Sequence, residues 1–255
     1  MPIAYPEKWE SMRGNATLAL KMAADFGKMA LTINFVRPAE DFFGLSREEE
    51  AMNIVCLDME GVLVPEIWIA FAQESGIPEL TRTTRDEPDY DKLMRWRLGV
   101  LREHGMGLKE IQKIIARIDP LPGAKEFLDK LRSEMQAIIL SDTFEEFAQP
   151  LMEKLGWPTI FCNSLDVGED GFIRSIRMRC AQSKLTTVRG LQSIGFDTIA
   201  AGDSYNDLDM IRASKAGFLF RTTEQIKKEH PQLPAYETYG ELLGAILRAA
   251  HGEDR

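Results

Sequence analysis

Short apolar runs alternate with amphipathic stretches along most of this chain. The runs hold four or five residues each and are rich in β-branched side chains, which predicts buried strands rather than helices. The predicted strands are Asn53–Leu57, Gln136–Leu140, Thr159–Cys162, Thr198–Ala201 and Ala216–Phe220. Apolar residues at helical spacing predict helices at Glu66–Ser75, Tyr90–His104, Leu108–Ile118, Ala124–Ser133, Phe144–Leu155, Lys184–Ile194 and Tyr239–Ala250. This alternation implies an α/β fold with a mostly parallel sheet and right-handed crossovers.

The helices between residues 66 and 120 interrupt the alternation. A plain doubly wound domain reaches its second strand after about 30 residues, but no strand pattern appears here between the first strand and Pro120. We therefore predict a Rossmann-like, doubly wound core formed by residues 52–65 and 121–255, with an all-helical cap inserted at residues 66–120.

A small β-hairpin is predicted within the second part of the core. Ser164–Val167 and Phe172–Ile176 flank Gly168-Glu169-Asp170-Gly171, a turn sequence rich in glycine and acidic residues. The hairpin would add an antiparallel pair to an otherwise parallel sheet.

Residues 1–51 differ from the rest of the chain. Ala16 to Leu31 has the pattern of an amphipathic helix, but glycines and a proline interrupt the segment, and Arg47 to Glu50 is a run of charge. Met52 then begins a strand at once, as a natural start site would. We expect residues 1–51 to be a poorly ordered extension or a mis-called translation start; a packed accessory helix is the alternative.

The composition suits one globular domain with room for an insert. Of 255 residues, 44% are hydrophobic and 28% are charged. A formal net charge of −9 and a pI near 5.0 argue against nucleic acid as the main partner. The three cysteines show no C-x-x-C spacing, which favours a reduced, cytoplasmic setting. Charged residues interrupt the most apolar early segment, so neither a membrane span nor a secretory signal is predicted; a homodimer is compatible with the sequence.

Acidic side chains stand where predicted strands end. Asp58 and Glu60 follow the first strand, and Asp203 and Asp207 follow Thr198–Ala201. Parallel strands bring such ends to one edge of the sheet, where ligands bind in open α/β folds. Carboxylates crowded there would raise one another's pKa unless a cation lay among them. Oxygen ligands without histidine or cysteine point to Mg²⁺.

Hydroxyl groups follow the second strand. Those of Ser141 and Thr143, with the backbone N–H groups of a helix start, suit a phosphate. Lys184 would neutralise charge on a transferring phosphoryl group. Arg177 and Arg179 compete with Lys184 for that role, and the spacing to the next strand favours Lys184. Thr143 could instead cap the following helix.

This set and order of motifs resembles the haloacid dehalogenase superfamily of aspartate-nucleophile phosphatases, over residues 53–222. The resemblance implies that Asp58 is the nucleophile and becomes an aspartyl-phosphate, and that Ser141 and Lys184 bind the phosphoryl group. Glu60 stands where the family usually has an aspartate as general acid and base, so its carboxylate is displaced by one methylene. The Mg²⁺ ligands implied are Asp58, Glu60 through its backbone carbonyl, Asp203 and Asp207.

The helical insert resembles that of phosphoserine phosphatases. In those enzymes, a glutamate after the first motif binds the substrate ammonium, and an arginine of the insert binds the substrate carboxylate. Glu66 matches the glutamate if this sequence has a one-residue deletion after the first motif, and Arg97 matches the arginine. The motifs resemble most closely the bacterial enzymes that pass phosphate from phosphoserine to water or homoserine, in serine and threonine biosynthesis. That branch also carries glutamate at the position of Glu60. The substrate-binding residues implied are Glu66, Arg97, Ser141, Asp142, Thr143 and Asn206.

Other interpretations stay open. Glu66 and Arg97 could be ordinary surface residues, which leaves a phosphatase for another small phosphomonoester. Arg95 competes with Arg97 from a different face of the same helix. A phospho-accepting signalling module also uses strand-end acids, but it lacks an acid at the position of Glu60 and has no helical insert. Aromatic residues of the insert, such as Trp68, are predicted to form its core.

Overall fold

The computed structural model describes residues 52–252. The predicted extension, residues 1–51, lies outside them. The helices and strands, in chain order, are β1 (Met52–Leu57), α2 (Ile67–Ser75), η3 (Pro78–Thr81), α3 (Tyr90–Glu103), α4 (Leu108–Ile115), α5 (Ala124–Glu134), β2 (Gln136–Phe144), α6 (Glu145–Lys154), β3 (Thr159–Val167), β4 (Ile173–Arg177), α7 (Ser183–Ser193), β5 (Phe196–Gly202), η4 (Tyr205–Asp207), α8 (Leu208–Ala213), β6 (Ala216–Phe220), α9 (Glu224–Glu229), β7 (Ala235–Tyr236) and α10 (Tyr239–His251).

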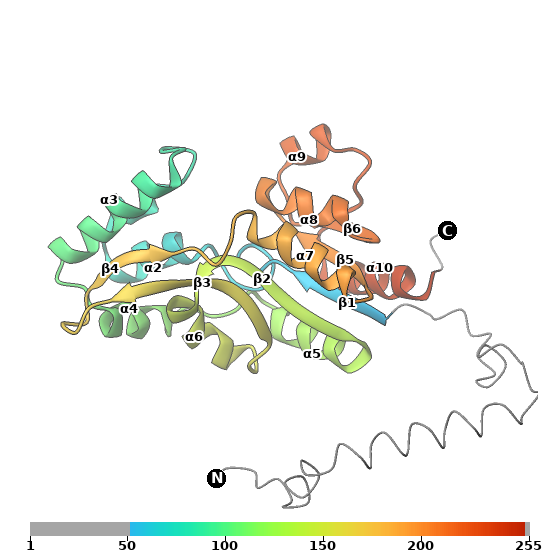
Figure 1. Cartoon of the computed structure of the whole chain (residues 1–255), viewed down its shortest axis with the longest axis horizontal. Helices are drawn as coiled ribbons and strands as arrows, with labels where there is room; N and C mark the ends of the chain where they lie inside the picture. The colour runs from blue at the N-terminus through green and yellow to red at the C-terminus, as the bar shows by residue number, and fades with distance from the viewer. Residues whose placement is uncertain (1–51, 253–255) are drawn as a thin grey trace, which may run out of the picture. The chain divides into compact units, whose positions relative to one another are not determined.

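The strands between residues 52 and 252 form one seven-stranded sheet in the order β4-β3-β2-β1-β5-β6-β7 (Figure 1). Among these described strands, β4 pairs antiparallel with β3 and every other neighbouring pair is parallel. Cys56 of β1 lies beside Ile138 of β2 and Ala200 of β5. This register brings the carboxyl ends of the three strands to one edge and confirms the predicted α/β fold with its hairpin.

Alternate residues of β1 pack into two different layers, as the two-residue period of a strand requires. Ile54 and Cys56 belong to a cluster with buried residues of α7, α8 and α9. Val55 and Leu57 belong to a larger cluster with residues of α5, α6 and α10. Helices therefore cover both faces of the sheet, and β1 at its centre is buried on each side (Figure 1).

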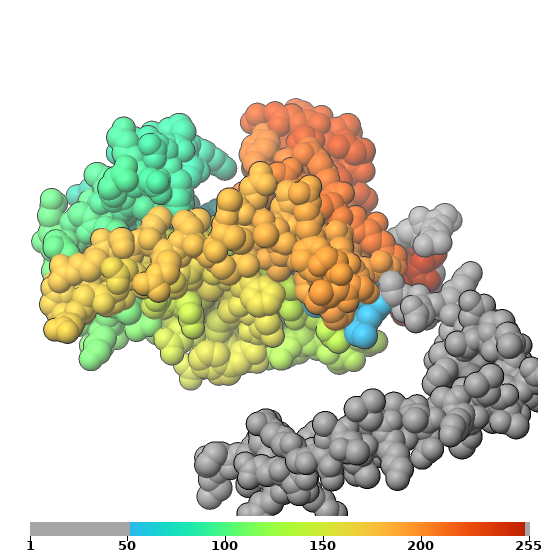
Figure 2. Space-filling model, in the orientation of Figure 1, coloured from blue at the N-terminus to red at the C-terminus, as the bar shows by residue number. Residues whose placement is uncertain are grey.

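The insert between β1 and α5 contains α2, η3, α3 and α4. It packs against the hairpin as well as the core: the backbone N–H of Leu108 donates to the carbonyl of Gly171 at 2.8 Å. Apolar residues of α2 and α4, including Phe71 and Ile111, join the larger cluster. Figure 2 shows the surface hollowed between the insert, in teal, and the orange-red region that carries α8 and α9.

Two strands are longer than their apolar runs predict. β2 continues past Leu140 to Phe144, with irregular pairing to β3 between these residues. β3 runs without a break through Asn163, where the sequence indicates two separate segments. The Asn163 amide donates to the carbonyl of Asp142 at 2.9 Å and accepts from the N–H of Arg179 at 3.0 Å. Partners distant in sequence thus allow a buried polar residue inside a strand.

Five short elements among the described residues, η3, η4, α8, α9 and β7, have no counterpart in the sequence prediction. Helices of six residues are not stable alone, and their apolar pattern is too short to recognise. Tertiary burial of Met210 and Ile226 holds α8 and α9 against the sheet. None of the helices between residues 52 and 252 is long and apolar enough to cross a membrane.

Candidate active site

Asp58 lies directly after β1, at the edge where the parallel strands end. Its backbone N–H donates to the carbonyl of Ala201 on β5 at 2.9 Å, which continues the ladder past the strand. Its side chain is buried. Gly61 then turns the chain at a φ of 79°, a left-handed conformation that favours glycine. A buried nucleophile candidate is thereby fixed at a sharp turn.

The carboxylates of Asp58, Asp203 and Asp207 converge, each with one oxygen within 4.8 Å of the others. Burial and then the charge of Asp207 raise the pKa of Asp58 well above its usual range. The same two causes raise the pKa of Asp203 to about 7. A divalent cation would relieve this repulsion, and carboxylate oxygens are the donors that Mg²⁺ prefers. The residues present therefore fit the Mg²⁺ predicted from the sequence.

Lys184, in the first turn of α7, bridges this cluster. Its Nζ lies 2.7 Å from Oδ1 of Asp58 and 2.6 Å from Oδ1 of Asp207, and all three side chains are buried. Burial disfavours the ammonium, but the charges of Asp58 and Asp207 outweigh it and raise the lysine pKa. Arg177 and Arg179, the competing residues, are exposed. Lys184 is thus the cation that contacts the acids.

Asp207 is held on both of its carboxylate oxygens. Oδ2 accepts from the backbone N–H groups of Asp203 and Ser204, each at 3.0 Å, and Oδ1 accepts from Lys184 at 2.6 Å. Ser204 and Asp207 also form a capping box at the start of η4. These bonds fix the loop after β5 and so the position of Asp203 beside Asp58.

Ser141 and Thr143 lie at the buried end of β2. The Ser141 Oγ accepts a hydrogen bond from the backbone N–H of Thr143 at 3.2 Å. α6 begins at Glu145 without a side-chain capping bond, so Thr143 does not cap it. Both hydroxyls therefore stand at the same sheet edge as the acids.

Asp142 ties three segments of the site together. Its Oδ1 accepts from the Ser183 hydroxyl at 2.7 Å, and its Oδ2 accepts from the Asn206 amide at 2.9 Å. Asp142 and Asn206, two residues assigned to substrate binding from the sequence, are thus bonded to each other. They join the end of β2 to the start of α7 and to the loop after β5.

Glu60 faces the start of the insert. Its carboxylate accepts a hydrogen bond of 2.8 Å from the backbone N–H of Ile67, at the first position of α2. Burial and the neighbouring charge of Glu66 raise the pKa of Glu60 to about 7, although the bond from Ile67 lowers it. Glu66 itself is exposed, at the N-cap of α2. The two glutamates thus lie at the junction of core and insert.

Arg97 of α3 is buried, with 5% of its surface exposed, whereas the competing Arg95 is exposed. Its Nη2 donates to the carbonyl of Arg82 at 2.6 Å, and its guanidinium lies over the Trp68 ring, 4.4 Å from the centroid. Burial lowers its pKa to about 10, so the charge is kept. Its buried Nε has no hydrogen-bond partner among the described residues. The surface-residue interpretation of Arg97 is therefore wrong.

The sequence did not point to several groups that surround these residues. Ser183 holds Asp142, and its position next to Lys184 is the only sequence signal for it. Burial raises the pKa of Tyr90 to about 12, and the charges of Asp142 and Arg97 act on the same phenol. Tyr90 is thus near enough to both charges to feel them, a proximity that only the tertiary fold reveals.

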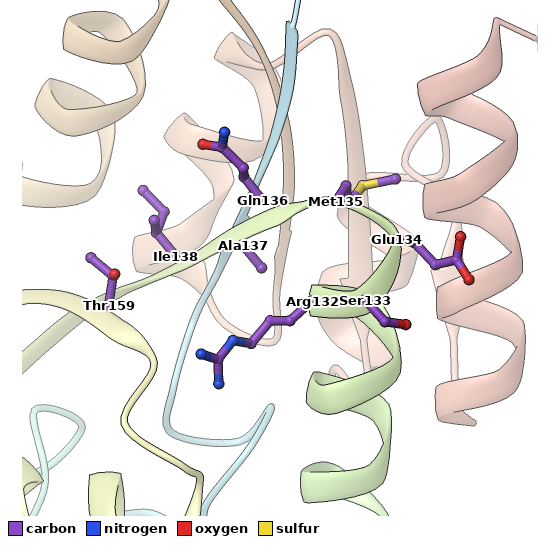
Figure 3. Close-up of a pocket in the computed structure, with 8 residues that line it drawn as sticks. All are labelled: Arg132, Ser133, Glu134, Met135, Gln136, Ala137, Ile138 and Thr159. Carbon is purple, nitrogen blue, oxygen red and sulfur yellow. The ribbon is translucent and has the colours of Figure 1, made fainter.

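Two surface hollows lie away from these residues. One, of about 440 Å³, is lined by residues 132–138 and Thr159, at the amino ends of β2 and β3 (Figure 3). The other, of about 800 Å³, lies beside the start of β6, between α8 and α10. Both are at the opposite ends of the strands from Asp58, so neither belongs to the acidic site.

Comparison with known proteins places this geometry in a family. Residues 52–215 match the model of haloacid dehalogenase-like hydrolases. The chain is 50% identical over 199 residues to phosphoserine phosphatase ThrH of Pseudomonas aeruginosa. The aligned region covers 78% of this chain and 97% of that protein. It is 49% identical over 205 residues to a phosphoserine phosphatase of Pseudomonas syringae pv. tomato, covering 80% of this chain and 86% of that one.

A solved structure of a phospho-aspartyl intermediate analogue of phosphoserine phosphatase shares the fold. It superposes with a TM-score of 0.62 at 21% identity, over 76% of this chain and 99% of that chain. The match to the family model and the two close relatives agree with this likeness. With its acids, lysine and hydroxyls at one sheet edge, the chain belongs to the haloacid dehalogenase-like hydrolases.

Proposed function

We propose that this protein is a Mg²⁺-dependent phosphoserine phosphatase that also transfers the phosphoryl group to homoserine. The observation that carries the proposal is the buried Arg97 of the insert, whose Nε has no hydrogen-bond partner among the described residues. A buried guanidinium donor calls for an acceptor such as a carboxylate, which phosphoserine has and simple phosphate esters lack. The names of two relatives about half identical to this chain support the same substrate.

Asp58 acts as the nucleophile in this proposal. One of its carboxylate oxygens attacks phosphorus, and the bond from phosphorus to the serine oxygen breaks, which leaves an aspartyl-phosphate. Lys184, 2.7 Å from Asp58, offsets the negative charge of the attacking and transferring groups. The hydroxyls of Ser141 and Thr143 and the start of α6 receive the phosphoryl oxygens. Asp58, Asp203, Asp207 and the backbone carbonyl of Glu60 would hold Mg²⁺, which supplies positive charge to the phosphoryl oxygens when bound.

Glu60 moves the proton in both halves of the reaction. Protonated, it donates to the departing serine oxygen; ionised, it accepts the proton of the incoming water or homoserine as that oxygen attacks phosphorus. Asp58 is then released as a carboxylate, which balances the cycle. A pKa of about 7 suits both tasks near neutral pH.

Glu66 and Arg97 bind the amino-acid part of the substrate. Arg97 offers N–H donors to the carboxylate, and the exposed carboxylate of Glu66 attracts the ammonium group. Thr143 and Asn206 complete the pocket at the core side, and Asp142 holds Asn206 in place through its Oδ2 at 2.9 Å. Homoserine carries the same ammonium and carboxylate as serine on a chain one methylene longer. The same two residues can therefore orient it as an acceptor.

Residues 66–120 form the cap of this site in our proposal, and residues 52–65 and 121–255 its catalytic core. The placement of Glu60 and Glu66 at their junction supports this division. We also propose a cytoplasmic enzyme, because Cys56, Cys162 and Cys180 are all free thiols.

The decisive experiment incubates the full chain with phosphoserine, Mg²⁺ and homoserine and follows phosphorus NMR. We expect free phosphate without homoserine, and both phosphate and phosphohomoserine with it. Free phosphate as the sole product, with and without homoserine, would exclude the proposed transferase activity. No product from phosphoserine, with turnover of p-nitrophenyl phosphate, would leave a phosphatase for another small phosphomonoester.

A further inference from the structure

The Arg97 guanidinium stacks on the face of an aromatic ring. Its carbon Cζ lies 4.4 Å from the centroid of the Trp68 ring, on α2 of the same insert. On one edge, Nη2 donates to the carbonyl of Arg82 at 2.6 Å, and Nη1 lies 3.7 Å from the sulfur of Met94. The ring and these two contacts define both the plane and the rotation of the guanidinium.

Trp68 is in turn fixed by aromatic contacts that reach the core. Its ring meets that of Phe147 on α6 edge-on, with centroids 5.5 Å apart, and that of Phe71 at 6.4 Å. Phe147 packs edge-on against Phe144, the last residue of β2, at 5.7 Å. Rings at these separations and angles have the favoured geometry of aromatic pairs. The column of Trp68, Phe147 and Phe144 thus joins the insert arginine to the strand that carries Ser141.

The unpaired Nε of Arg97 indicates that the stacked guanidinium binds a ligand. It is the one buried side-chain nitrogen or oxygen atom without a hydrogen-bond partner between residues 52 and 252. Such a donor costs free energy unless a ligand supplies an acceptor. A guanidinium free to rotate about its side-chain bonds could turn this donor toward a protein carbonyl or solvent. Stacking on Trp68 restricts that rotation, so the donor stays available.

We propose that Trp68 is a positioning residue for substrate recognition: its ring holds the Arg97 guanidinium in the plane that receives the substrate carboxylate. This inference rests on the proposed phosphoserine phosphatase function. Trp68 does not touch the reacting atoms in this scheme; it acts through Arg97. The aromatic column connects the carboxylate-binding donor to the strand whose end binds the phosphoryl group.

The test compares Trp68→Leu and Trp68→Met with Trp68→Phe and the original protein. Leucine and methionine fill space without an aromatic face, whereas phenylalanine keeps one. We expect the KM for phosphoserine to rise about 10-fold in the first two variants, with kcat and the KM for p-nitrophenyl phosphate changed by less than about twofold, and we expect phenylalanine to restore most of the loss. If the Trp68→Leu variant does not fold, the Trp68→Met variant is compared with Trp68→Phe instead.

Two controls separate positioning from general packing. Trp157→Leu makes the same change at an exposed tryptophan before β3, and we expect it to alter neither KM. In an Arg97→Ala background, Trp68→Leu should add less than about twofold to the KM for phosphoserine, because its effect passes through Arg97. The inference would be overturned if Trp68→Leu raised the KM for phosphoserine as much in the Arg97→Ala background as in the original protein. It would also be overturned if Trp68→Leu raised the KM for phosphoserine and for p-nitrophenyl phosphate equally. Absence of phosphoserine turnover by the original protein would instead refute the proposed function.

Discussion

The carboxylate of Glu60 accepts a 2.8 Å hydrogen bond from the backbone N–H of Ile67, so the first turn of α2 holds the residue that moves the proton in our proposal. An aspartate at this position would be one methylene shorter. The longer side chain of Glu60 therefore links the loop after β1 to the insert, and the charge of Glu66 contributes to its raised pKa. In our proposal, the residue that transfers the proton and the residue that binds the substrate ammonium therefore meet at one helix start.

Glu60→Gln keeps an oxygen for the Ile67 N–H but cannot transfer a proton. We expect kcat for phosphoserine to fall about 100- to 10,000-fold. The leaving group of p-nitrophenyl phosphate departs as p-nitrophenolate and needs no proton, so this substrate should phosphorylate the variant at nearly the original rate. The reaction should then stall at the phosphorylated enzyme. Stopped-flow absorbance should show a burst of p-nitrophenol equal to the enzyme concentration. Equal slowing of both substrates without a burst would contradict the role of Glu60.

Asp58→Asn removes the proposed nucleophile and leaves the shape of the side chain. We expect turnover to fall by more than about 1,000-fold, with an unchanged circular dichroism spectrum. After acid quenching, intact-protein mass should show a phosphorylated species for the original protein and none for the variant. Asp209→Asn, at an exposed site on α8, is the matched control and should behave like the original protein. Retained turnover in Asp58→Asn would exclude Asp58 as nucleophile.

Arg97→Ala should raise the KM for phosphoserine by about 100-fold, because charge-assisted hydrogen bonds to a carboxylate contribute about 1.5–3 kcal/mol. The KM for p-nitrophenyl phosphate, which has no carboxylate, should stay within about twofold. Arg95→Ala provides the same change at an exposed position of α3 and should alter neither value. A similar rise in KM for both substrates would show that Arg97 maintains the insert rather than binding the carboxylate.

The central strands and the convergence of the acids could be predicted because both follow from local pattern and parallel topology. The run from Asn53 corresponds to β1, and the register beside β5 brings Asp58 next to Asp203 and Asp207. No sequence pattern, in contrast, indicates the direction of a side chain. Trp68 fits an amphipathic helix, and its stacking on Arg97 depends on how two separate helices of the insert, α2 and α3, pack together.

The end of β2 shows a second limit of sequence reasoning. Asp142 is a strand-end acid like Asp58, which favours a role with the substrate. In the structure its oxygens are engaged by Ser183 and Asn206, from two other segments. Whether an acid faces the ligand or braces the loops depends on these distant partners, so spacing alone does not separate the two cases.

Gly61→Ala tests the close approach of the loop after β1 to Asp203. A Cβ at Gly61 would overlap the Asp203 carboxylate, whereas nothing lies within 4 Å of one at Gly76; both residues have positive φ, 79° and 71°. Each alanine variant should lose about 1 kcal/mol of stability from backbone strain. Gly61→Ala should also weaken Mg²⁺ binding by about 10-fold or more. Isothermal titration with Mg²⁺ measures this difference, and equal affinities in the two variants would contradict it.

The metal-free protein should lose stability as the pH rises from about 4 to about 7. In the folded chain, the pKa of Glu60 is raised from 4.5 to about 7, and that of Asp203 from 3.8 to about 7. The folded state therefore binds more protons than the unfolded chain across this window. The free energy of unfolding should fall by about 1.4 kcal/mol per pH unit for each group. Lys184 stays charged in both states here and adds no slope.

Mg²⁺ should reverse this loss, because it favours the ionised carboxylates of Asp58, Asp203 and Asp207 over their protonated forms. Thermal unfolding of the metal-free and Mg²⁺-loaded protein between about pH 5 and pH 8 measures both effects. We expect the stabilisation by Mg²⁺ to grow with pH, and Asp203→Asn to reduce both the pH slope and the response to the metal. Asp197→Asn, at a partly exposed surface ion pair, should leave the response to Mg²⁺ unchanged. A Tm of the metal-free protein that is flat or rises over this range would mean that the acids are not held above their ordinary pKa, and the electrostatic argument for a cation among them would fail.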